Sequence, residues 1–207
     1  MAGFNEVRSK SVVLAQTNID TDQIIPARFL STTERAGLGK NAFNDWRWQA
    51  DGSPNPAFPF NQPENIGRSI LLAGRNFGCG SSREHAVWGM LQYGIRGIVG
   101  SSYGAIFADN AANNGLLLLS LPLEQVAALM AGLDEGAGDM TVDLDAQRIE
   151  MGAYAAGFDI DPATRQALML GLDRIGETLT HADRIRVFEK AYLGRKPWLM
   201  GADSDEY

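Results

Sequence analysis

A wholly apolar strand that leads through a glycine-rich turn into an amphipathic helix constrains the fold more than any other segment. The strand is expected at residues 70–73, the turn at residues 74–82 and the helix at residues 83–93, with Gly94 at its C-terminal end. The alternation continues, with strands expected at residues 98–99 and 116–119 and helices at residues 103–114 and 122–133. Strands that alternate with helices of this length form parallel βαβ units, so the sequence predicts an α/β fold with a mostly parallel core.

The two ends of the chain add elements of a different character. Residues 11–15 predict a further buried strand, followed by a short helix over residues 23–30 that Asp22 would cap. Towards the C-terminus we expect a hairpin of residues 141–144 and 148–151, a strand within residues 153–159, a helix over residues 162–170 capped by Asp161, and a last helix capped by Thr180 and ending at Gly194. No linker is evident, so we expect one domain over residues 1–207 with an antiparallel appendage.

Residues 31–65 follow no regular period and contain several prolines and aromatic side chains. An irregular segment of this length is usually a functional loop or a disordered linker, and the aromatic side chains favour a functional loop. Two alternatives exist for four of these aromatics, packing beneath the loop or docking on a partner protein: Trp46, Trp48, Phe58 and Phe60. Because aromatic side chains are enriched at interfaces, we expect docking.

Composition excludes several classes of protein. Cys79 is the one cysteine among 207 residues, which excludes an internal disulfide and any self-contained zinc finger or iron–sulfur site. The 25 acidic and 18 basic residues give a formal net charge of −7, which argues against nucleic acid or an anionic membrane as a partner. The N-terminus lacks a signal-peptide pattern, and Ser120 and Pro122 interrupt the longest apolar region. We therefore expect a cytoplasmic protein without a membrane-spanning helix.

The densest polar constellation lies in residues 76–85, where the strand turns into the helix. Two glycines in this turn allow positive φ and would point successive N–H groups into a concave anion-binding nest. The start of the helix adds unsatisfied N–H donors, and Arg83 adds a planar fork that suits a carboxylate or phosphate. Ser81 and Ser82 would place hydroxyls in the same field, where an alkoxide would be stabilised and a serine could transfer a proton.

A structural alternative exists for each of these residues. Ser81 and Glu84 have the spacing of a capping box, and Ser82 is an alternative N-cap. By spacing alone, a capping serine is more common than a catalytic one. His85 would then be a helix-start histidine with satisfied hydrogen bonds, and Cys79 a small residue in a crowded turn. The spacing therefore leaves both interpretations open.

Four segments taken together resemble one family: residues 18–26, 43–47, 76–86 and 171–179. In this order they are similar to the small subunits of bacterial 3-isopropylmalate dehydratase, which are separate-chain versions of the swivelling domain of aconitase. The Gly-Ser-Ser-Arg-Glu run at residues 80–84 would by itself indicate only the wider aconitase superfamily. The resemblance extends over nearly the whole chain and implies a three-layer β/β/α swivelling fold.

The resemblance implies a hydro-lyase that removes water from 2-isopropylmalate and adds it back to give 3-isopropylmalate, in leucine biosynthesis. It implies that Ser81 transfers the proton, that Arg83 binds a substrate carboxylate and that Ser82 is a further substrate contact. It also implies a [4Fe–4S] cluster on a large partner subunit, as Lewis acid for the departing hydroxyl, and no cofactor in this chain. The expected enzyme is a heterodimer that acts on a small dicarboxylate.

Specificity is expected to depend on residues 26–32. Related enzymes whose substrate has an extra carboxylate carry an arginine where this chain has Ser31. Its absence favours an apolar substituent such as an isopropyl group, and argues only against a homoaconitate enzyme. Arg28 would reach a carboxylate or, equally, lie on the surface with its stem packed on the short helix. The alternatives are the small subunit of a citraconate, dimethylmalate or homoaconitate hydro-lyase and, in a different class, a non-catalytic anion-binding or scaffolding protein.

Overall fold

The computed structural model describes residues 2–31, 34–134, 136 and 138–199. The chain forms two compact units, Met1–Leu172 and Asp173–Tyr207. The expectation of one domain over residues 1–207 stays a prediction.

A parallel sheet forms the centre of the first unit. Its strands are β2 (Ser11–Leu14), β3 (Ile70–Ala73), β4 (Gly97–Gly100) and β5 (Leu117–Ser120), side by side in that order. Three helices accompany them in the chain: α3 (Glu84–Tyr93), α4 (Ala105–Asn114) and α5 (Leu123–Asp134). Gly94 and Gly115 end α3 and α4 in the left-handed conformation, as their positions in the sequence predict. The parallel βαβ core is confirmed.

A second, antiparallel sheet lies in the same unit. Its strands are β1 (Glu6–Ser9), β6 (Met140–Asp143), β7 (Arg148–Met151) and β8 (Tyr154–Gly157), in the order β1-β6-β7-β8. The predicted hairpin is therefore confirmed as β6 and β7, with Thr141 opposite Glu150. The strand β1 was not predicted; it pairs with β6 and buries only Val7 among four residues. A strand with so little apolar alternation is hard to find by periodicity.

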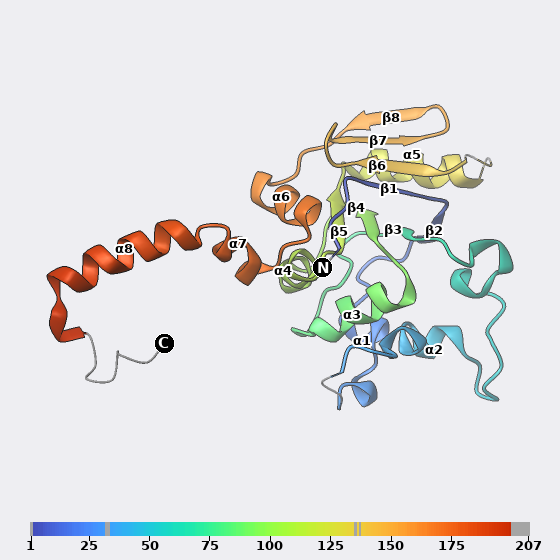
Figure 1. Cartoon of the computed structure of the whole chain (residues 1–207). Coiled ribbons are helices and arrows are strands. Elements are labelled where there is room, and N and C mark those ends of the chain that lie inside the picture. The colour runs from blue at the N-terminus through green and yellow to red at the C-terminus, as the bar shows by residue number, and fades with distance from the viewer. Residues whose placement is uncertain (1, 32–33, 135, 137, 200–207) are drawn as a thin grey trace. The chain divides into compact units, whose positions relative to one another are not determined.

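The strand β3 separates two hydrophobic cores. Leu71 and Ala73 belong to one core with residues of α1, α3 and α4. Ile70 and Leu72 point the other way, into a core shared with the antiparallel sheet and α5. Figure 1 shows the resulting layers, with the antiparallel sheet on one side of the parallel sheet and α3 on the other. The predicted three-layer β/β/α fold is confirmed.

The segment after β2 differs from its prediction. A four-residue helix, α1 (Thr21–Ile24), is capped by Asp20, whose carboxylate accepts from the N–H groups of Asp22 and Gln23 at 2.9 and 2.7 Å. The prediction that Asp22 caps a helix over residues 23–30 is wrong. Ile25 is extended because it precedes Pro26, so the helix ends there and a separate 3-10 turn, η1 (Ala27–Phe29), follows.

The aromatic loop contains short turns, η2 (Leu38–Asn41), α2 (Asn44–Arg47), η3 (Pro59–Asn61) and η4 (Pro63–Asn65). Phe58 and Phe60 are buried around Phe43, with ring centroids 5.7 and 5.6 Å from it. The expectation that these two phenylalanines dock on a partner is wrong, because they fill the chain's own core. Trp46 packs partly buried against the same core, and Trp48 is 37% exposed.

The C-terminal helices are α6 (Pro162–Leu170) in the first unit and α7 (Arg174–Leu179) and α8 (Ala182–Arg195), followed by η5 (Pro197–Leu199), in the second. Asp161 caps α6 as predicted, by accepting from the N–H of Thr164 at 2.8 Å. The prediction that Thr180 caps the last helix is wrong. Its hydroxyl donates to the carbonyl of Glu177 at 2.6 Å and so ends α7, a helix that was not predicted from the sequence.

Candidate active site

The turn between β3 and α3 has an unusual backbone. Asn76, Gly78 and Gly80 all have positive φ, at 60°, 71° and 93°. Gly78 is required by its surroundings as well, since a Cβ there would lie 2.8 Å from Cβ of Phe107 and closer still to the ring. The positive φ predicted for the two glycines of the turn is therefore confirmed.

Backbone hydrogen bonds hold this turn between two neighbouring segments. On one side, Gly78 N–H donates to the carbonyl of Ile19 at 2.7 Å, and Thr21 N–H donates to the carbonyl of Cys79 at 2.9 Å. On the other side, Phe77 N–H donates to the carbonyl of Ser102 at 3.2 Å. These segments follow the carboxyl ends of β2 and β4, so the turn lies at the edge of the parallel sheet where ligands bind in such folds.

The N–H groups of residues 76–78 are not available to the predicted nest of donors. Those three N–H groups donate within the protein, that of Asn76 to the hydroxyl of Ser102 at 3.0 Å. In the part of the chain that the structure describes, the N–H groups from Cys79 to Arg83 donate no hydrogen bond. The donors available to an anion therefore begin at Cys79.

The start of α3 decides the capping question. The helix begins at Glu84, its N-cap is Arg83 with φ −124° and ψ 98°, and no side chain caps it. Capping by Ser81 or Ser82 is therefore wrong. Both serines are exposed, and within the described residues neither hydroxyl makes a hydrogen bond. The N-terminus of a ten-residue helix thus keeps its positive end beside two serine hydroxyls.

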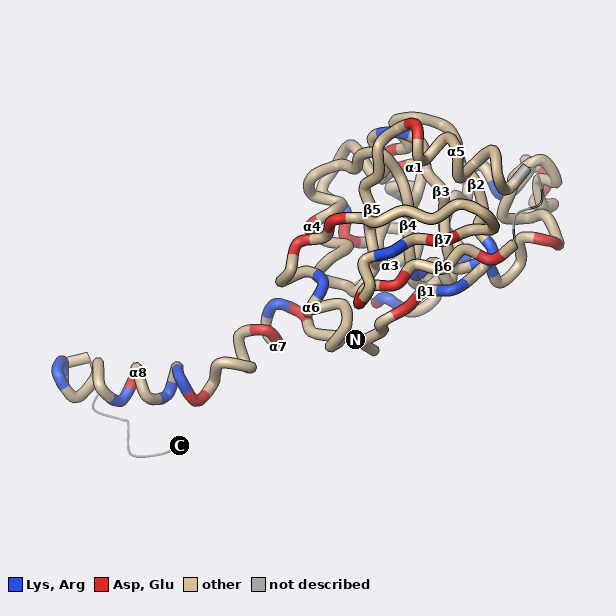
Figure 2. Tube along the Cα trace, turned by 90° about the horizontal axis from the view of Figure 1, so that it is seen from above, with Lys and Arg blue, Asp and Glu red and all other residues tan. Residues whose placement is uncertain are grey.

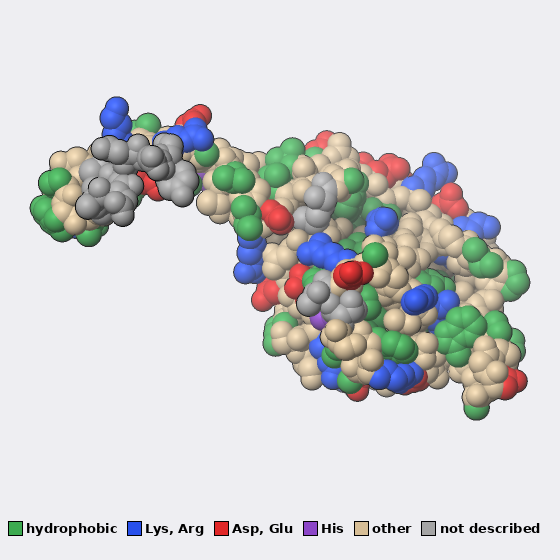
Figure 3. All heavy atoms as spheres, turned by 60° about the horizontal axis from the view of Figure 1, so that its bottom comes forward, with side chains coloured by type: hydrophobic (Ala, Val, Ile, Leu, Met, Phe, Trp, Pro, Cys, Tyr) green, Lys and Arg blue, Asp and Glu red, His purple; other side chains and the backbone are tan. Residues whose placement is uncertain are grey.

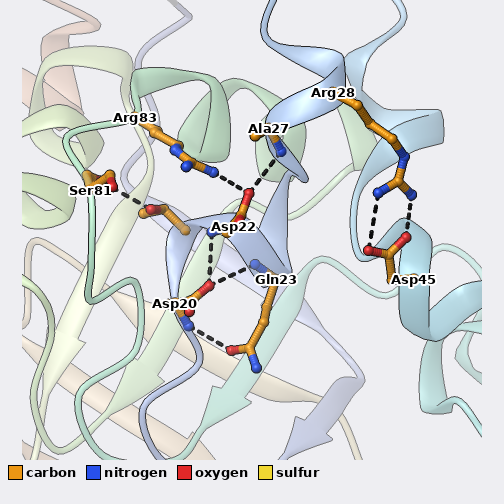
Figure 4. Close-up of polar contacts among 9 residues, drawn as sticks. Asp20, Asp22, Gln23, Ala27, Arg28, Asp45, Ser81 and Arg83 are labelled. Atoms are coloured by element: carbon orange, nitrogen blue, oxygen red, sulfur yellow. Dashed lines mark hydrogen bonds and ion pairs between the residues drawn. The ribbon is translucent and has the colours of Figure 1, made fainter.

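Arg83 is held in place by Asp22 across the sheet edge. Its Nη1 donates to Oδ1 of Asp22, which also accepts from Ala27 N–H at 2.7 Å, as Figure 4 shows. The Arg83 side chain is 18% exposed and the Asp22 side chain 55%. These hydrogen bonds, first from Arg83 and then from Ala27, hold the pKa of the Asp22 carboxyl below its usual range. Asp22 therefore stays ionised and orients the guanidinium.

Arg28 points to a different carboxylate (Figure 4). It makes a two-pronged ion pair with Asp45, donates to Oδ1 of Asn44 at 2.8 Å and lies 4.7 Å above the ring of Phe29. The hydrogen bond from Arg28 lowers the pKa of Asp45. A hollow of about 350 Å³ lies here, with Asp22, Arg28 and Asp45 among its lining residues. In this structure the carboxylate that Arg28 reaches is the chain's own.

The structure places the other candidates as follows. Ser31 is exposed just after η1, and in the described part of the chain its hydroxyl makes no hydrogen bond. Cys79 is half-buried in the turn. His85 packs against the ring of Trp88, with centroids 4.8 Å apart. Ser81, Ser82 and Arg83 thus lie in the loop before α3, whereas Arg28 lies in η1 and Ser31 follows it.

Two supporting residues were not predicted from the sequence. Asp22 was interpreted as a cap, although it contacts Arg83 over 61 positions of sequence. Asn114, at the end of α4, donates to the carboxylate of Glu84 at 2.7 Å and accepts from Trp88 Nε1 at 3.0 Å. It thereby ties the first residue of α3 to the last residue of α4. No local spacing predicts either contact, since each joins elements distant in the sequence.

The chain's residues do not fit an iron–sulfur cluster. Cys79 is its one thiol, and among the described residues no group of three or more His, Cys, Asp or Glu side chains could hold a metal ion. Nor is any helix in the described ranges long and apolar enough to cross a membrane.

Two family descriptions match this chain. One, the aconitase C-terminal domain, matches residues 1–124. The other, the C-terminal domain of the 3-isopropylmalate dehydratase small subunit, matches residues 175–202. The first covers the parallel sheet and the whole candidate site, and the second covers α7 from Ile175 onwards and all of α8.

Curated proteins resemble the chain over almost its full length. A 3-isopropylmalate dehydratase small subunit of Caulobacter vibrioides (strain NA1000 / CB15N) is 44% identical over 96% of this chain and 99% of its own. One from Shouchella clausii (strain KSM-K16) is 47% identical over 88% of this chain and 92% of its own. A crystal structure of a 3-isopropylmalate dehydratase from Methanocaldococcus jannaschii matches 89% of this chain and 99% of its own, with a TM-score of 0.63 and 23% identity. That structural likeness supports the fold.

Proposed function

The chain belongs to the family of 3-isopropylmalate dehydratase small subunits, and from this premise we propose that it interconverts 2-isopropylmalate and 3-isopropylmalate together with a large subunit. The family is one of hydro-lyases, so the reaction is a dehydration followed by a rehydration. In the proposed setting the enzyme works in the cytoplasm, in leucine biosynthesis.

One observation carries the proposal. Ser81, Ser82 and Arg83 precede an α-helix whose N-terminus no side chain caps, and the loop that holds them is hydrogen-bonded on both sides. A loop fixed in this way holds its functional groups ready for a substrate before it binds. An uncapped helix start also favours a bound carboxylate.

Arg83 is the proposed carboxylate-binding residue. Asp22 engages Nη1, and within the described residues the remaining guanidinium N–H groups donate no hydrogen bond. Those groups can therefore pair with a substrate carboxylate while Asp22 keeps the side chain in place. Ser82 is the proposed additional donor to the same anion.

Ser81 is the proposed proton-transfer residue. In the dehydration its oxygen takes the proton from the carbon next to the hydroxyl-bearing carbon, the electron pair forms the double bond, and hydroxide leaves. In the rehydration hydroxide adds to the carbon that lost its proton, and Ser81 returns a proton to the carbon that lost its hydroxyl. The N–H groups from Cys79 to Arg83, which donate no hydrogen bond among the described residues, and the start of α3 are the proposed stabilisers of the alkoxide form of the serine.

The proposed cofactor belongs to the large subunit. A [4Fe–4S] cluster there supplies a Lewis acid for the departing hydroxyl. This chain has one thiol, and its described residues include no group of side chains that could hold a metal ion. Its proposed contribution to the active site is therefore the proton-transfer and anion-binding residues. The complete enzyme is then a heterodimer.

The proposed specificity comes from the η1 segment. Ser31 places a small neutral side chain where an arginine would suit an additional carboxylate, and an apolar substituent fits that change. Arg28, already paired with Asp45, is the second candidate contact. The competing substrates are citraconate, dimethylmalate and homoaconitate.

Reconstitution tests the proposal. The chain is combined with its large subunit under anaerobic conditions, and 2-isopropylmalate, citraconate, dimethylmalate and homoaconitate are assayed as substrates of the complex. We expect turnover of 2-isopropylmalate above the others, and none by the isolated chain. Faster turnover of another acid would make that acid the substrate in place of 2-isopropylmalate. A complex that binds these acids without turnover would favour a non-catalytic binding protein.

A further inference from the structure

We propose that the apolar face of α7 and α8 is a docking surface for the large subunit. The inference rests on the proposed function, because it assumes that a large subunit exists. It adds the location of a contact that neither the fold nor the site requires.

The two helices bury nothing of their own. Neither α7 nor α8 contains a buried residue. Several large apolar side chains are strongly exposed, with Ile175 at 71%, Leu179 at 63% and Phe188 at 63%. Figure 3 shows hydrophobic atoms at the surface of this segment between basic side chains. A helix of 14 residues is marginally stable alone in water, so α8 gains stability from a surface that covers it.

The exposed side chains form a shaped surface. Ile185, Phe188 and Tyr192 recur at helical spacing along one side of α8, and the rings of Phe188 and Tyr192 stack with centroids 5.6 Å apart. Ile185 and Phe188 also line a hollow of about 500 Å³ where the end of α7 meets the start of α8. A hollow with an aromatic wall suits the insertion of an apolar side chain from another protein.

The family descriptions indicate which protein. Residues 1–124 match a domain described as the C-terminal part of aconitase, hence a piece of a longer chain, whereas residues 175–202 match a segment described as part of a small subunit. Domains joined in one chain meet at a high effective concentration, but separate subunits must obtain their association from contacts alone. Residues 175–202, which match the small-subunit description, are therefore the segment in which we expect a contact with the large subunit.

Charge adds the chemistry of the partner surface. On α8, basic side chains outnumber acidic ones, and Arg184 and Arg195 lie beside the apolar side of the helix, whereas Lys190 lies opposite it. Figure 2 shows these charges along the trace of α8. We therefore expect an apolar groove with an acidic rim on the large subunit. The rest of this chain carries more acidic than basic residues, so it also offers an acidic surface. A second copy of the chain is therefore the competing occupant of the face.

A double substitution in the full-length chain tests the surface. Ile185→Gln combined with Phe188→Gln removes the apolar wall but keeps good helix formers, and Lys190→Gln on the opposite side of α8 is the matched control. The binding of each variant to the purified large subunit is measured by calorimetry, and circular dichroism confirms folding. We expect the double variant to bind about 100-fold more weakly and the control to stay within about twofold. Activity should return when the double variant is present in large excess.

Two results would overturn the proposal. The first is an unchanged affinity of the double variant for the large subunit. The second is a dimer of the isolated wild-type chain that the double substitution abolishes while large-subunit affinity is kept, which assigns the face to a second copy. A tight wild-type complex that does not turn over 2-isopropylmalate would instead contradict the proposed function and leave the docking surface intact.

Discussion

Arg83 donates to the carboxylate of Asp22, a residue 61 positions earlier in the sequence. The contact joins the start of α3 to helix α1 and orients the guanidinium of the residue that follows Ser81 and Ser82. Because Asp22 also accepts from Ala27 N–H at 2.7 Å, one carboxylate orients Arg83 and fixes the turn that carries Arg28. The candidate site therefore depends on Asp22 as much as on the loop itself.

Asp22→Asn should weaken substrate binding. The amide keeps the shape but loses the charge that orients Arg83, so we expect KM to rise about tenfold with a smaller change in kcat. Steady-state kinetics of the reconstituted heterodimer measure both. Asp51→Asn is the control, since Asp51 is an exposed aspartate whose pKa is lowered by its hydrogen bonds with Ser53. An equal effect of the two substitutions would refute an orienting role for Asp22.

The same substitution has a predictable pH dependence. The pKa of Asp22 is lowered in the folded protein, so its contribution to stability is complete above its ordinary pKa of 3.8 and is lost as the pH falls through the folded value. We expect Asp22→Asn to lower the thermal midpoint at pH 7 and to approach the wild type as the pH falls progressively below 3.8. A difference that persists far below that pH would have to come from packing.

Ser81→Ala should abolish turnover without loosening the protein. The serine does not cap α3, so its removal costs no helix hydrogen bond, whereas the proposed proton transfer loses its oxygen. We expect kcat to fall at least about 100-fold, with assembly and the thermal midpoint unchanged. Ser82→Ala, its neighbour in the same loop, should mainly raise KM. Comparable kcat for Ser81→Ala and the wild type would remove Ser81 from the chemistry.

The βαβ core was predictable because its signals are local. Residues 70–73 are wholly apolar, and Gly94 and Gly115 stand where α3 and α4 end. The loop of Ser81 and Arg83 could be found in the same way, from glycines between a strand and a helix. Its chemical role came from resemblance rather than from spacing, because Ser81 and Glu84 have the spacing of a capping box that the structure does not form.

What escaped prediction depends on contacts between distant segments. The aromatic side chains of the loop were expected to contact a partner protein, but Phe58 and Phe60 pack around Phe43. This packing depends on core residues from distant parts of the sequence. The N–H groups free to bind an anion could not be identified for a similar reason, since Gly78 N–H donates to the carbonyl of Ile19. Composition shows that aromatic rings and N–H donors exist, and only the assembled fold shows which of them the protein itself consumes.

Gly78→Ala should destabilise the turn for two reasons. The residue has φ 71°, and a Cβ would press on the ring of Phe107. We expect a loss of about 3 kcal/mol in the free energy of unfolding, from backbone strain and overpacking together. Urea denaturation measures it. Gly52→Ala separates the two causes, because Gly52 has φ 81° with nothing within 4 Å of an added Cβ, and it should lose only about 1 kcal/mol. Equal losses would assign the whole effect to the backbone.

Asn114→Asp should uncouple α3 from α4 in a pH-dependent manner. Asn114 is 6% exposed and donates to both the carboxylate of Glu84 and the carbonyl of Asn110. An aspartate there turns two donated hydrogen bonds into repulsions, so we expect a loss of about 2 kcal/mol at pH 7. Because repulsion raises the folded pKa of one of the two carboxyls, that loss should diminish as the pH falls towards about 4.

Asn113→Asp provides the matched control for this prediction. It places the same charge in the last turn of α4 and therefore shares the unfavourable interaction with the helix dipole, about 0.5 kcal/mol. Asn113 is only partly buried, and within the described residues its side chain makes no hydrogen bond. Urea denaturation at pH 7 and pH 4 should therefore show a loss that depends strongly on pH for Asn114→Asp and weakly for Asn113→Asp. If the two variants behaved alike, the tie between Glu84 and Asn114 would contribute nothing beyond the dipole. A lowered kcat/KM of Asn114→Asp in the heterodimer, restored towards pH 4 alongside stability, would further link this tie to the loop of Ser81, which ends directly before Glu84.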